Sequence, residues 1–252
     1  MKLACFHFHD DLNDFMPVER KEVLFSYTFQ GPQSVKHLIE SLGVPHTEVG
    51  RILVNESQCG FEYLVKDGDV IQVFPIFIAK GDNPDLSQSF PPGERRFILD
   101  NHLGRLAYYL RMLGVDCLYR NDYQDDDLAM VASQGERILL TRDRRLLMRN
   151  AVHYGYWVRN KTPRLQLVEV MRRFALSDSI IPFHRCMRCN GILQPAKKED
   201  VLPHLLPLTK KYFEDFRICP DCEQVYWKGS HYERMNKLIE QALNDVFLVD
   251  KS

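Results

Sequence analysis

The stretch FILDNHLGRLAYYLRMLGVDCLYRNDYQDDDLAMVASQGERILLTRDRRLL, from Phe97 to Leu147, decides how the chain folds. Its apolar residues switch between the spacing of strands and the spacing of helices, which predicts strand, helix, short strand, helix and strand in turn. Strands that alternate with helices form a parallel sheet with right-handed crossovers. The middle of the chain is therefore predicted to be an α/β domain.

An aspartate follows each apolar strand of this stretch, and aspartates also open its second helix. Asp100 ends the first strand, Asp143 follows the last one by two residues, and Asp125 stands at the helix start. Ligands of open parallel sheets bind beyond the carboxyl ends of the strands, so we expect Asp100 and Asp143 on one rim. Each residue has a structural alternative, because aspartate also caps helices and suits turns.

Carboxylates that converge from distant chain positions would suit a divalent cation. Mg²⁺ and Mn²⁺ are hard ions that take carboxylate and water oxygens. Two such ions about 3.5–4 Å apart can activate a water and stabilise the leaving oxygen in phosphodiester hydrolysis. Metal-dependent hydrolysis of a phosphodiester is therefore the chemistry that these aspartates suggest.

Residues 1–79 form a first unit with another order of elements. Ser34 can cap a helix that carries its apolar residues on one face and ends at Gly43. A turn is expected near Asn55. The strands are expected around Phe6 and Phe8 and at 23–29, 50–54, 63–65 and 70–74. The order of strand, strand, helix and strands is that of a β-grasp domain.

Residues 80–96, KGDNPDLSQSFPPGERR, read as a linker, since they are rich in Gly, Pro, Ser and charge without periodicity. Charge changes across this segment: residues 1–82 carry 7 Lys+Arg and 12 Asp+Glu, whereas residues 83–179 carry 15 and 12. All basic residues of the middle section except Lys161 are arginine, which can bind phosphate with two hydrogen bonds. The composition fits a nucleic-acid partner, and a solvated charged surface is the alternative.

Composition also bears on the compartment. The chain has no run of 18 or more apolar residues, and its start lacks a basic segment followed by an apolar one, so we expect neither a membrane span nor a secretory signal. Seven cysteines suit no complete disulfide framework. A cytoplasmic location is the expectation.

Four of the cysteines form two C-x-x-C pairs, Cys186 with Cys189 and Cys219 with Cys222, separated by 29 residues. Four thiolates suit tetrahedral Zn²⁺, and a full thiolate set leaves no position for a reactive water, so a structural zinc site is predicted. Free thiols or two redox pairs are the alternatives. A terminal helix is expected from about His231 to Val246.

The first unit resembles the small ubiquitin-like sulfur-carrier proteins through VKHLIESLGVPHTEVGRILVNES and LVKDGDVIQVFPI. Those carriers end in a free Gly-Gly whose carboxylate is activated. Here the chain continues through Pro75–Gly81, so we expect a recognition or packing module.

The chain from Phe97 to Trp227 resembles the Mut7-C RNase family, a PIN-like nuclease domain with a C-terminal zinc ribbon. The matching pieces are LDNHLGRLAYYLRMLGVDCLYR, DDDLAMVA, RILLTRD, the two C-x-x-C pairs and YWKGSHYERM. The first unit resembles the ubiquitin-like domain often fused ahead of it. This resemblance implies domains at 1–79, 97–180 and 181–252 with a linker at 80–96.

The resemblance places the PIN-type acidic set on Asp100, Asp143 and the acidic helix start. Asp125 is chosen there because Ala132 matches the alanine that the PIN pattern has seven residues later, and Asp126 is the reserve. A fourth acid of many PIN nucleases has no clear match, which leaves the second catalytic metal open.

The resulting hypothesis is a ribonuclease that depends on Mg²⁺ or Mn²⁺. The alternative is a protein that binds RNA or a ribonucleoprotein through a PIN-like site with weak or no catalysis. RNA is the expected partner, and the acidic first unit is a candidate surface for a protein partner. The candidates for RNA phosphate contacts are Arg142, Arg144 and Arg145.

Overall fold

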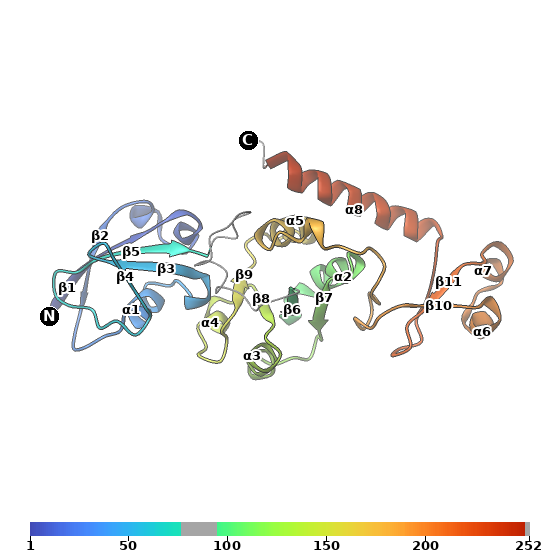
Figure 1. The fold of residues 1–252 in the computed structure, drawn as a ribbon, viewed down its shortest axis with the longest axis horizontal. Coiled ribbons are helices and arrows are strands. Elements are labelled where there is room, and N and C mark those ends of the chain that lie inside the picture. Colours follow the sequence, from blue (N-terminus) through green and yellow to red (C-terminus); the bar gives the residue numbers. More distant parts are fainter. Residues whose placement is uncertain (77–94, 250–252) are drawn as a thin grey trace. The chain divides into compact units, whose positions relative to one another are not determined.

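The computed structural model describes residues 1–76 and 95–249 (Figure 1). These residues form two compact units. One unit comprises residues 1–76 and 125–157, and the other comprises residues 95–124 and 158–249. The α/β stretch quoted above therefore contributes elements to both units. Most of the expected linker, residues 80–94, lies outside the described residues, while Arg96 already belongs to a strand.

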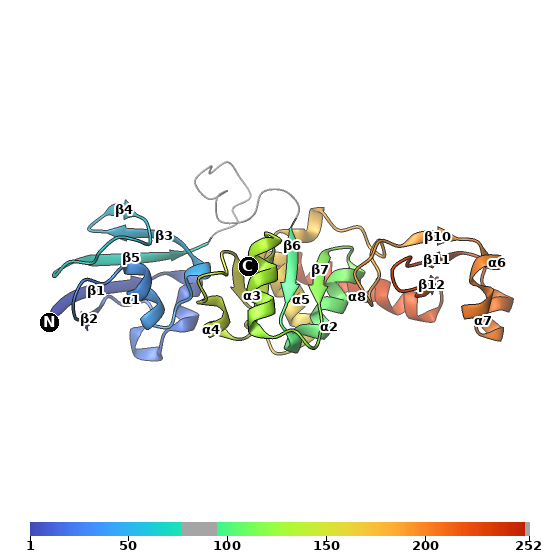
Figure 2. The same cartoon turned by 90° about the horizontal axis from the view of Figure 1, so that it is seen from below.

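Five strands of the first unit form a mixed sheet in the order β2-β1-β5-β3-β4 (Figure 2). Strand β1 (Lys2–Phe8) pairs antiparallel with β2 (Phe25–Phe29) and parallel with β5 (Val70–Pro75). Strand β3 (Val49–Val54) pairs antiparallel with β5 and with β4 (Ser57–Cys59). This mixed sheet with a helix between β2 and β3 confirms the β-grasp prediction.

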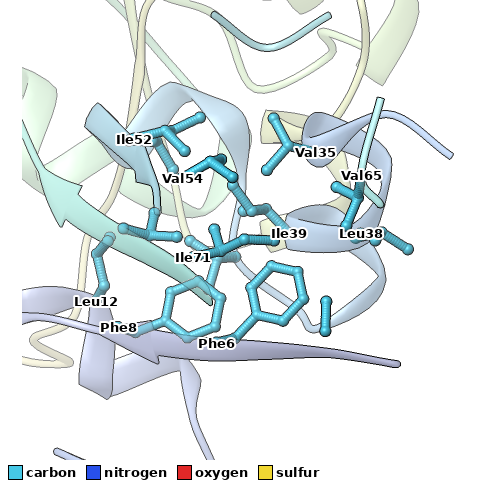
Figure 3. Packing of buried hydrophobic residues seen from close by; sticks show 14 of the residues in the cluster. Phe6, Phe8, Leu12, Val35, Leu38, Ile39, Ile52, Val54, Val65 and Ile71 are labelled. Atoms are coloured by element: carbon cyan, nitrogen blue, oxygen red, sulfur yellow. The ribbon is translucent and has the colours of Figure 1, made fainter. Parts of the chain in front are cut away.

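Helix α1 (Val35–Ser41) is this helix, and it begins where the sequence predicts. The Ser34 hydroxyl accepts a hydrogen bond from the backbone N–H of His37 at 3.2 Å, which satisfies one of the donors that a helix start leaves open. Helix α1 packs on the sheet through side chains that are buried together with Phe6 and Phe8 of β1 (Figure 3). Burial of each such side chain contributes about 1.5–3 kcal/mol, so this cluster holds the β-grasp module together.

The prediction of a strand at 63–65 is wrong. Leu64 forms only an isolated bridge with Ser34, and the strand that follows β3 is β4. Asn55 and Glu56 both adopt positive φ, at 49° and 69°, and this turn returns the chain directly into β4. Positive φ at both central residues matches the right-handed twist of a hairpin, so the local turn decides where the strand forms.

The first unit also contains the segment from 125 to 157. Helix α3 (Asp125–Gln134) leads into β8 (Ile138–Thr141), and α4 (Arg144–Leu147) leads into β9 (Gly155–Trp157). Strands β8 and β9 pair in parallel. Trp157 packs against the β-grasp core, so this α/β segment and the β-grasp module share a hydrophobic interior.

The second unit begins with β6 (Arg96–Leu99), which pairs in parallel with β7 (Asp116–Tyr119). Helix α2 (Gly104–Met112) connects these two strands, and α5 (Pro163–Arg173) packs against α2. Helix α8 (Ser230–Val249) lies alongside α5 (Figure 1). Parallel strands flanked by helices confirm the α/β prediction. Pro163 begins α5, since proline suits the first position of a helix, and Thr162 makes no side-chain cap.

The second unit ends in a small antiparallel sheet, β10-β11-β12, at Gln194–Ala196, Phe216–Ile218 and Val225–Trp227. The long gap between the cysteine pairs holds α6 (Lys198–Val201) and α7 (Pro207–Tyr212). These elements pack around Val201, Leu205, Phe216 and Val225. Among the described residues, no helix has the length and apolar character that a membrane crossing requires.

Candidate functional site

The four predicted cysteine ligands lie together in the second unit. Their sulfur atoms are all within 4.8 Å of one another, with Cys186 and Cys222 3.6 Å apart and Cys189 and Cys219 3.3 Å apart. Among residues 1–76 and 95–249, this is the one cluster in which three or more Cys, His, Asp or Glu side chains bring their possible ligand atoms this close to one another. Four convergent thiols can hold a structural metal such as zinc.

The backbone at both C-x-x-C pairs wraps around the sulfur atoms. Asn190 and Glu223, which each follow the second cysteine of a pair, adopt positive φ of 79° and 58°. Their N–H groups donate to the carbonyls of the first cysteines, Cys186 at 2.9 Å and Cys219 at 2.8 Å. A Cβ at Gly191 would lie 3.0 Å from the sulfur of Cys219, so glycine keeps this position open.

Tyr226 supports the cysteine cluster from β12. Its hydroxyl lies 3.2 Å from the sulfur of Cys186. Burial raises the pKa of the Cys186 thiol, but hydrogen bonds from Tyr226 and from the backbone outweigh it and bring the pKa down to about 7. Burial, followed by contact with Cys186, raises the pKa of Tyr226 above its usual range. The phenol thus stays protonated and can donate to a thiolate, as partners of metal ligands do.

The first cysteine pair is attached to β7 by Asn190. The Asn190 carboxamide accepts from the backbone N–H of Cys117 at 2.9 Å and donates to the Asp116 carboxylate at 3.0 Å. Arg185 lies 3.5 Å from the same carboxylate and donates to the carbonyl of Asn190 at 3.1 Å. Side-chain bonds to backbone therefore fix the cluster on the α/β part of this unit.

Arg111 of α2 makes a second attachment. Its side chain is only 3% exposed, and it donates to the carbonyl of Cys117 at 2.9 Å and to that of Arg188 at 2.9 Å. Backbone carbonyls thus satisfy a buried guanidinium that would otherwise be costly. The sequence did not indicate this role. An arginine on the apolar face of α2 was the only available signal.

Asp100 is the most buried of the three aspartates. It follows β6, whose residues Phe97, Ile98 and Leu99 are all fully buried, and it is itself only 6% exposed. It stands at the N-cap position of the turn Asn101–Leu103, yet its side chain makes no capping hydrogen bond there. Capping of that turn therefore does not explain a buried carboxylate at this position.

Asp143 caps α4. Its Oδ1 accepts a hydrogen bond from the backbone N–H of Arg145 at 2.8 Å, and its own N–H donates to the hydroxyl of Thr141 at 2.9 Å. Asp143 is exposed. Asp143 thus acts as a helix cap, which is the alternative to metal binding, and the cap uses one of its two carboxylate oxygens. A role as metal ligand stays a prediction.

Asp125 is the first residue of α3 and is exposed. Its carboxylate lies 3.5 Å from the guanidinium of Arg149, which also forms an ion pair with Asp126. Arg149 is 38% exposed, so solvent screens both pairs and each contributes little to stability. The choice of Asp125 over Asp126 stays a prediction.

The three candidate arginines have different surroundings. The guanidinium carbon of Arg144 lies 4.0 Å from the ring centroid of Trp157 and 5.0 Å from that of Phe15. The carbonyl of Arg142 accepts from the indole N–H of Trp157 at 3.3 Å. Arg145 is exposed. Arg144 thus has a packing role that the sequence did not reveal, and Arg145 offers the most accessible guanidinium of the three.

Two family models match the chain and together cover most of it. The model of the Mut7-C RNAse domain matches residues 95–239, and the model of the Mut7-C ubiquitin domain matches residues 1–80. The chain belongs to the Mut7-C family. Searches of curated proteins and of solved structures found no match. The Mut7-C RNAse match includes Asp100, Asp125, Asp143 and the four cysteines, and it supports a ribonuclease-type function.

Proposed function

We propose that this Mut7-C protein is a metal-dependent ribonuclease that hydrolyses RNA phosphodiester bonds. The observation that carries the proposal is the buried carboxylate of Asp100, at the end of a buried strand inside the segment that matches the Mut7-C RNAse domain. Carboxylate oxygens at the end of a buried strand are held in place by the strand, and they are the ligands that Mg²⁺ and Mn²⁺ prefer.

The proposed oxygen ligands for Mg²⁺ or Mn²⁺ are Asp100 of the second unit and Asp125 and Asp143 of the first. The residues present fit a hard cation, because all three are carboxylates and the cap at Asp143 uses only its Oδ1. A bound ion of this kind would lower the pKa of a water that attacks phosphorus and would neutralise charge on the leaving oxygen. Arg145 would hold a phosphate of the RNA backbone.

A cleavage assay tests this proposal. Purified protein is incubated with end-labelled single-stranded RNA and with structured RNA, with Mn²⁺, with Mg²⁺, or with no added divalent ion. The proposal expects cleavage only with Mn²⁺ or Mg²⁺ and its loss in Asp100→Asn. Asp122→Asn is a matched control, since Asp122 is exposed and pairs with Arg120 in the same unit. Equal cleavage by wild type and Asp100→Asn contradicts the assignment.

We further propose that the four cysteines hold one structural Zn²⁺. Four thiolates complete a tetrahedral shell, so the ion would stabilise the fold and not take part in hydrolysis. The bonds from Asn190 and Arg111 to the first cysteine pair support this, because they make the cluster continuous with β7.

The second candidate function is RNA or ribonucleoprotein binding without efficient cleavage. Two observations favour it: Asp125 is paired with Arg149, and Asp143 is engaged as a cap. RNA binding that persists without divalent ions, together with no cleavage in Mn²⁺, would support this candidate over the ribonuclease. A cytoplasmic location and a protein partner on the acidic β-grasp module remain part of either proposal.

A further inference from the structure

A cavity of about 490 Å³ lies in the second unit between the sheet β10-β11-β12 and the start of α8. Its size falls within the range of pockets that hold small ligands. Its lining combines apolar side chains with aromatic rings and two cations, and it contains none of the residues proposed for hydrolysis. The polar and aromatic residues that matter for its chemistry are Phe183, Arg217, Tyr226, Trp227, Lys228 and Tyr232.

The aromatic rings are held in fixed positions. The rings of Phe183 and Tyr232 pack with centroids 4.5 Å apart and planes inclined by 38°. The Tyr226 ring is anchored through its hydroxyl, 3.2 Å from the sulfur of Cys186. Trp227, on the same strand, keeps 37% of its surface exposed. A large aromatic side chain left exposed beside a cavity offers a flat face to a planar ligand.

Two cations and two acids line the cavity. Arg217 donates to the carbonyl of Phe183 at 2.9 Å, which fixes the guanidinium at the cavity and leaves it further N–H donors. Lys228 is exposed next to Trp227. Of the two acids in the lining, Glu214 forms an ion pair with Lys198 at 2.5 Å. The other, Asp215, is exposed and can accept from an amino group.

We propose that this cavity binds one nucleotide of single-stranded RNA. The base stacks on Trp227 beside Tyr232, and Arg217 and Lys228 contact the adjoining phosphates. Stacking of bases on aromatic side chains beside backbone-binding cations is how proteins bind single strands without reading their sequence. The identification of RNA as the ligand rests on the proposed function, while the place and the chemistry of the site rest on the cavity.

Binding without cleavage tests this site. The full-length, zinc-loaded protein is titrated with a fluorescein-labelled 12-nucleotide oligouridylate without added divalent ions, and fluorescence anisotropy reports the Kd. Trp227→Ala is expected to weaken binding about tenfold, the value for the loss of one stacked base. Trp227→Phe is expected to retain most of the affinity, because it keeps a ring. Lys228→Gln should weaken binding and lower its dependence on salt by about one counterion.

Matched controls lie on α7 of the same unit. Tyr212, which is 64% exposed and outside the cavity lining, controls for Trp227, and the exposed Lys210 controls for Lys228. Tyr212→Ala and Lys210→Gln are expected to bind like wild type. The same oligouridylate in a duplex is expected to bind more weakly, since its bases cannot reach a stacking platform. Unchanged affinity in Trp227→Ala, or an equal loss in Tyr212→Ala, overturns the proposal.

Photocrosslinking gives a readout that does not depend on the folding of a variant. Wild-type protein crosslinked to 4-thiouridine RNA should yield modified peptides at Trp227 or Tyr232, and crosslinks found only elsewhere overturn the site. The outcomes also separate this site from the hydrolytic proposal. Weak binding by Trp227→Ala in a protein that never cleaves RNA supports the site and contradicts the ribonuclease. Normal binding by Trp227→Ala, in a protein that cleaves RNA, contradicts the site and supports the ribonuclease.

Discussion

Glu48 accepts a hydrogen bond from the backbone N–H of Trp157 at 2.6 Å, and this bond joins the β-grasp module to strand β9. Glu48 is 1% exposed. Nearby, the His46 ring lies 2.9 Å from the carbonyl of Val152, and the ring of Trp157 lies 5.1 Å from that of Phe15. The ubiquitin-like module therefore packs within its unit against the segment from 125 to 157. That side of the module serves intramolecular packing.

Replacement of Glu48 should destabilise this packing. In Glu48→Ala the backbone N–H of Trp157 loses its acceptor in a buried place, which costs about 1–3 kcal/mol of the free energy of unfolding. Urea denaturation measures the loss, and hydrogen exchange should show faster exchange at the amide of Trp157. Glu19→Ala is the control, because Glu19 is exposed and belongs to the same module. Unchanged protection of the Trp157 amide in Glu48→Ala would contradict this role.

Arg144 and Arg145 are neighbours on α4 and should respond differently to truncation. Arg144→Ala removes a cation from the rings of Trp157 and Phe15, and we expect a loss of about 1–2 kcal/mol in stability. Arg145→Ala removes an exposed side chain and should change stability by less than about 0.5 kcal/mol while it weakens RNA binding. Guanidinium denaturation and RNA titration of both variants make the comparison. Equal losses of stability in Arg144→Ala and Arg145→Ala would contradict a packing role for Arg144.

Local signals in the sequence predicted most of the fold. The cap at Ser34 and the start of α5 at Pro163 depend on residues next to one another, so they can be read without a structure. The prediction of a strand at 63–65 was wrong. Asn55 and Glu56 form a tight turn with positive φ, so β3 pairs with β4 directly after this turn. The bond between Glu48 and Trp157 joins positions 109 residues apart, and no local pattern encodes it.

Loss of one cysteine should release the metal. Wild-type protein is expected to contain about one zinc per chain, and Cys219→Ser should lose it together with the ordered environment of Tyr226. Elemental analysis and near-ultraviolet circular dichroism measure the two effects. Cys5→Ser is the control, because Cys5 lies in the β-grasp module and is not one of the four cysteines of the cluster. A zinc-free wild-type protein with an unchanged melting temperature would contradict a structural metal.

His9 should make the stability of the first unit depend on pH. Its ring stacks on Phe74 with centroids 4.1 Å apart, and burial, followed by the nearby His7, lowers its pKa below the usual 6.5. Between the lowered pKa and 6.5 the unfolded chain binds a proton more readily than the folded chain does. The free energy of unfolding should therefore be highest above about pH 6.5 and fall as the pH drops through this window.

Urea denaturation between pH 5 and pH 8 tests the contribution of His9. His9→Phe keeps a ring on Phe74 and removes the titration, so its stability should vary less with pH than that of wild type. His204→Gln serves as the control, because His204 is exposed in another part of the chain. An identical pH profile for wild type and His9→Phe would exclude His9 as the cause.

The candidate sites were predictable to different degrees. The spacing of the cysteines was enough to predict their convergence, whereas Arg111, which contacts the first pair from α2, lies more than 70 residues earlier in the chain. For the aspartates, the sequence left capping and metal binding as alternatives. The structure shows a capping bond at Asp143 and none at Asp100, and metal binding by either residue stays a prediction.

The central claim is that the carboxylate of Asp143 takes part in RNA hydrolysis in addition to its cap. Asp143→Asn separates the two roles, because asparagine caps a helix as well as aspartate does but carries no charge. We expect its stability to stay within about 0.5 kcal/mol of wild type, whereas Asp143→Ala loses about 1 kcal/mol. Ser34→Ala, which removes the cap of α1, should lose similar stability and keep full activity.

The most direct test is the single-turnover rate of RNA cleavage by Asp143→Asn in Mn²⁺. The account predicts a rate at least about a hundredfold below that of wild type, in a protein of wild-type stability, because charge stabilisation of a transition state commonly contributes two to three powers of ten. Cleavage at the wild-type rate would mean that Asp143 only caps α4, and it would contradict the acidic site.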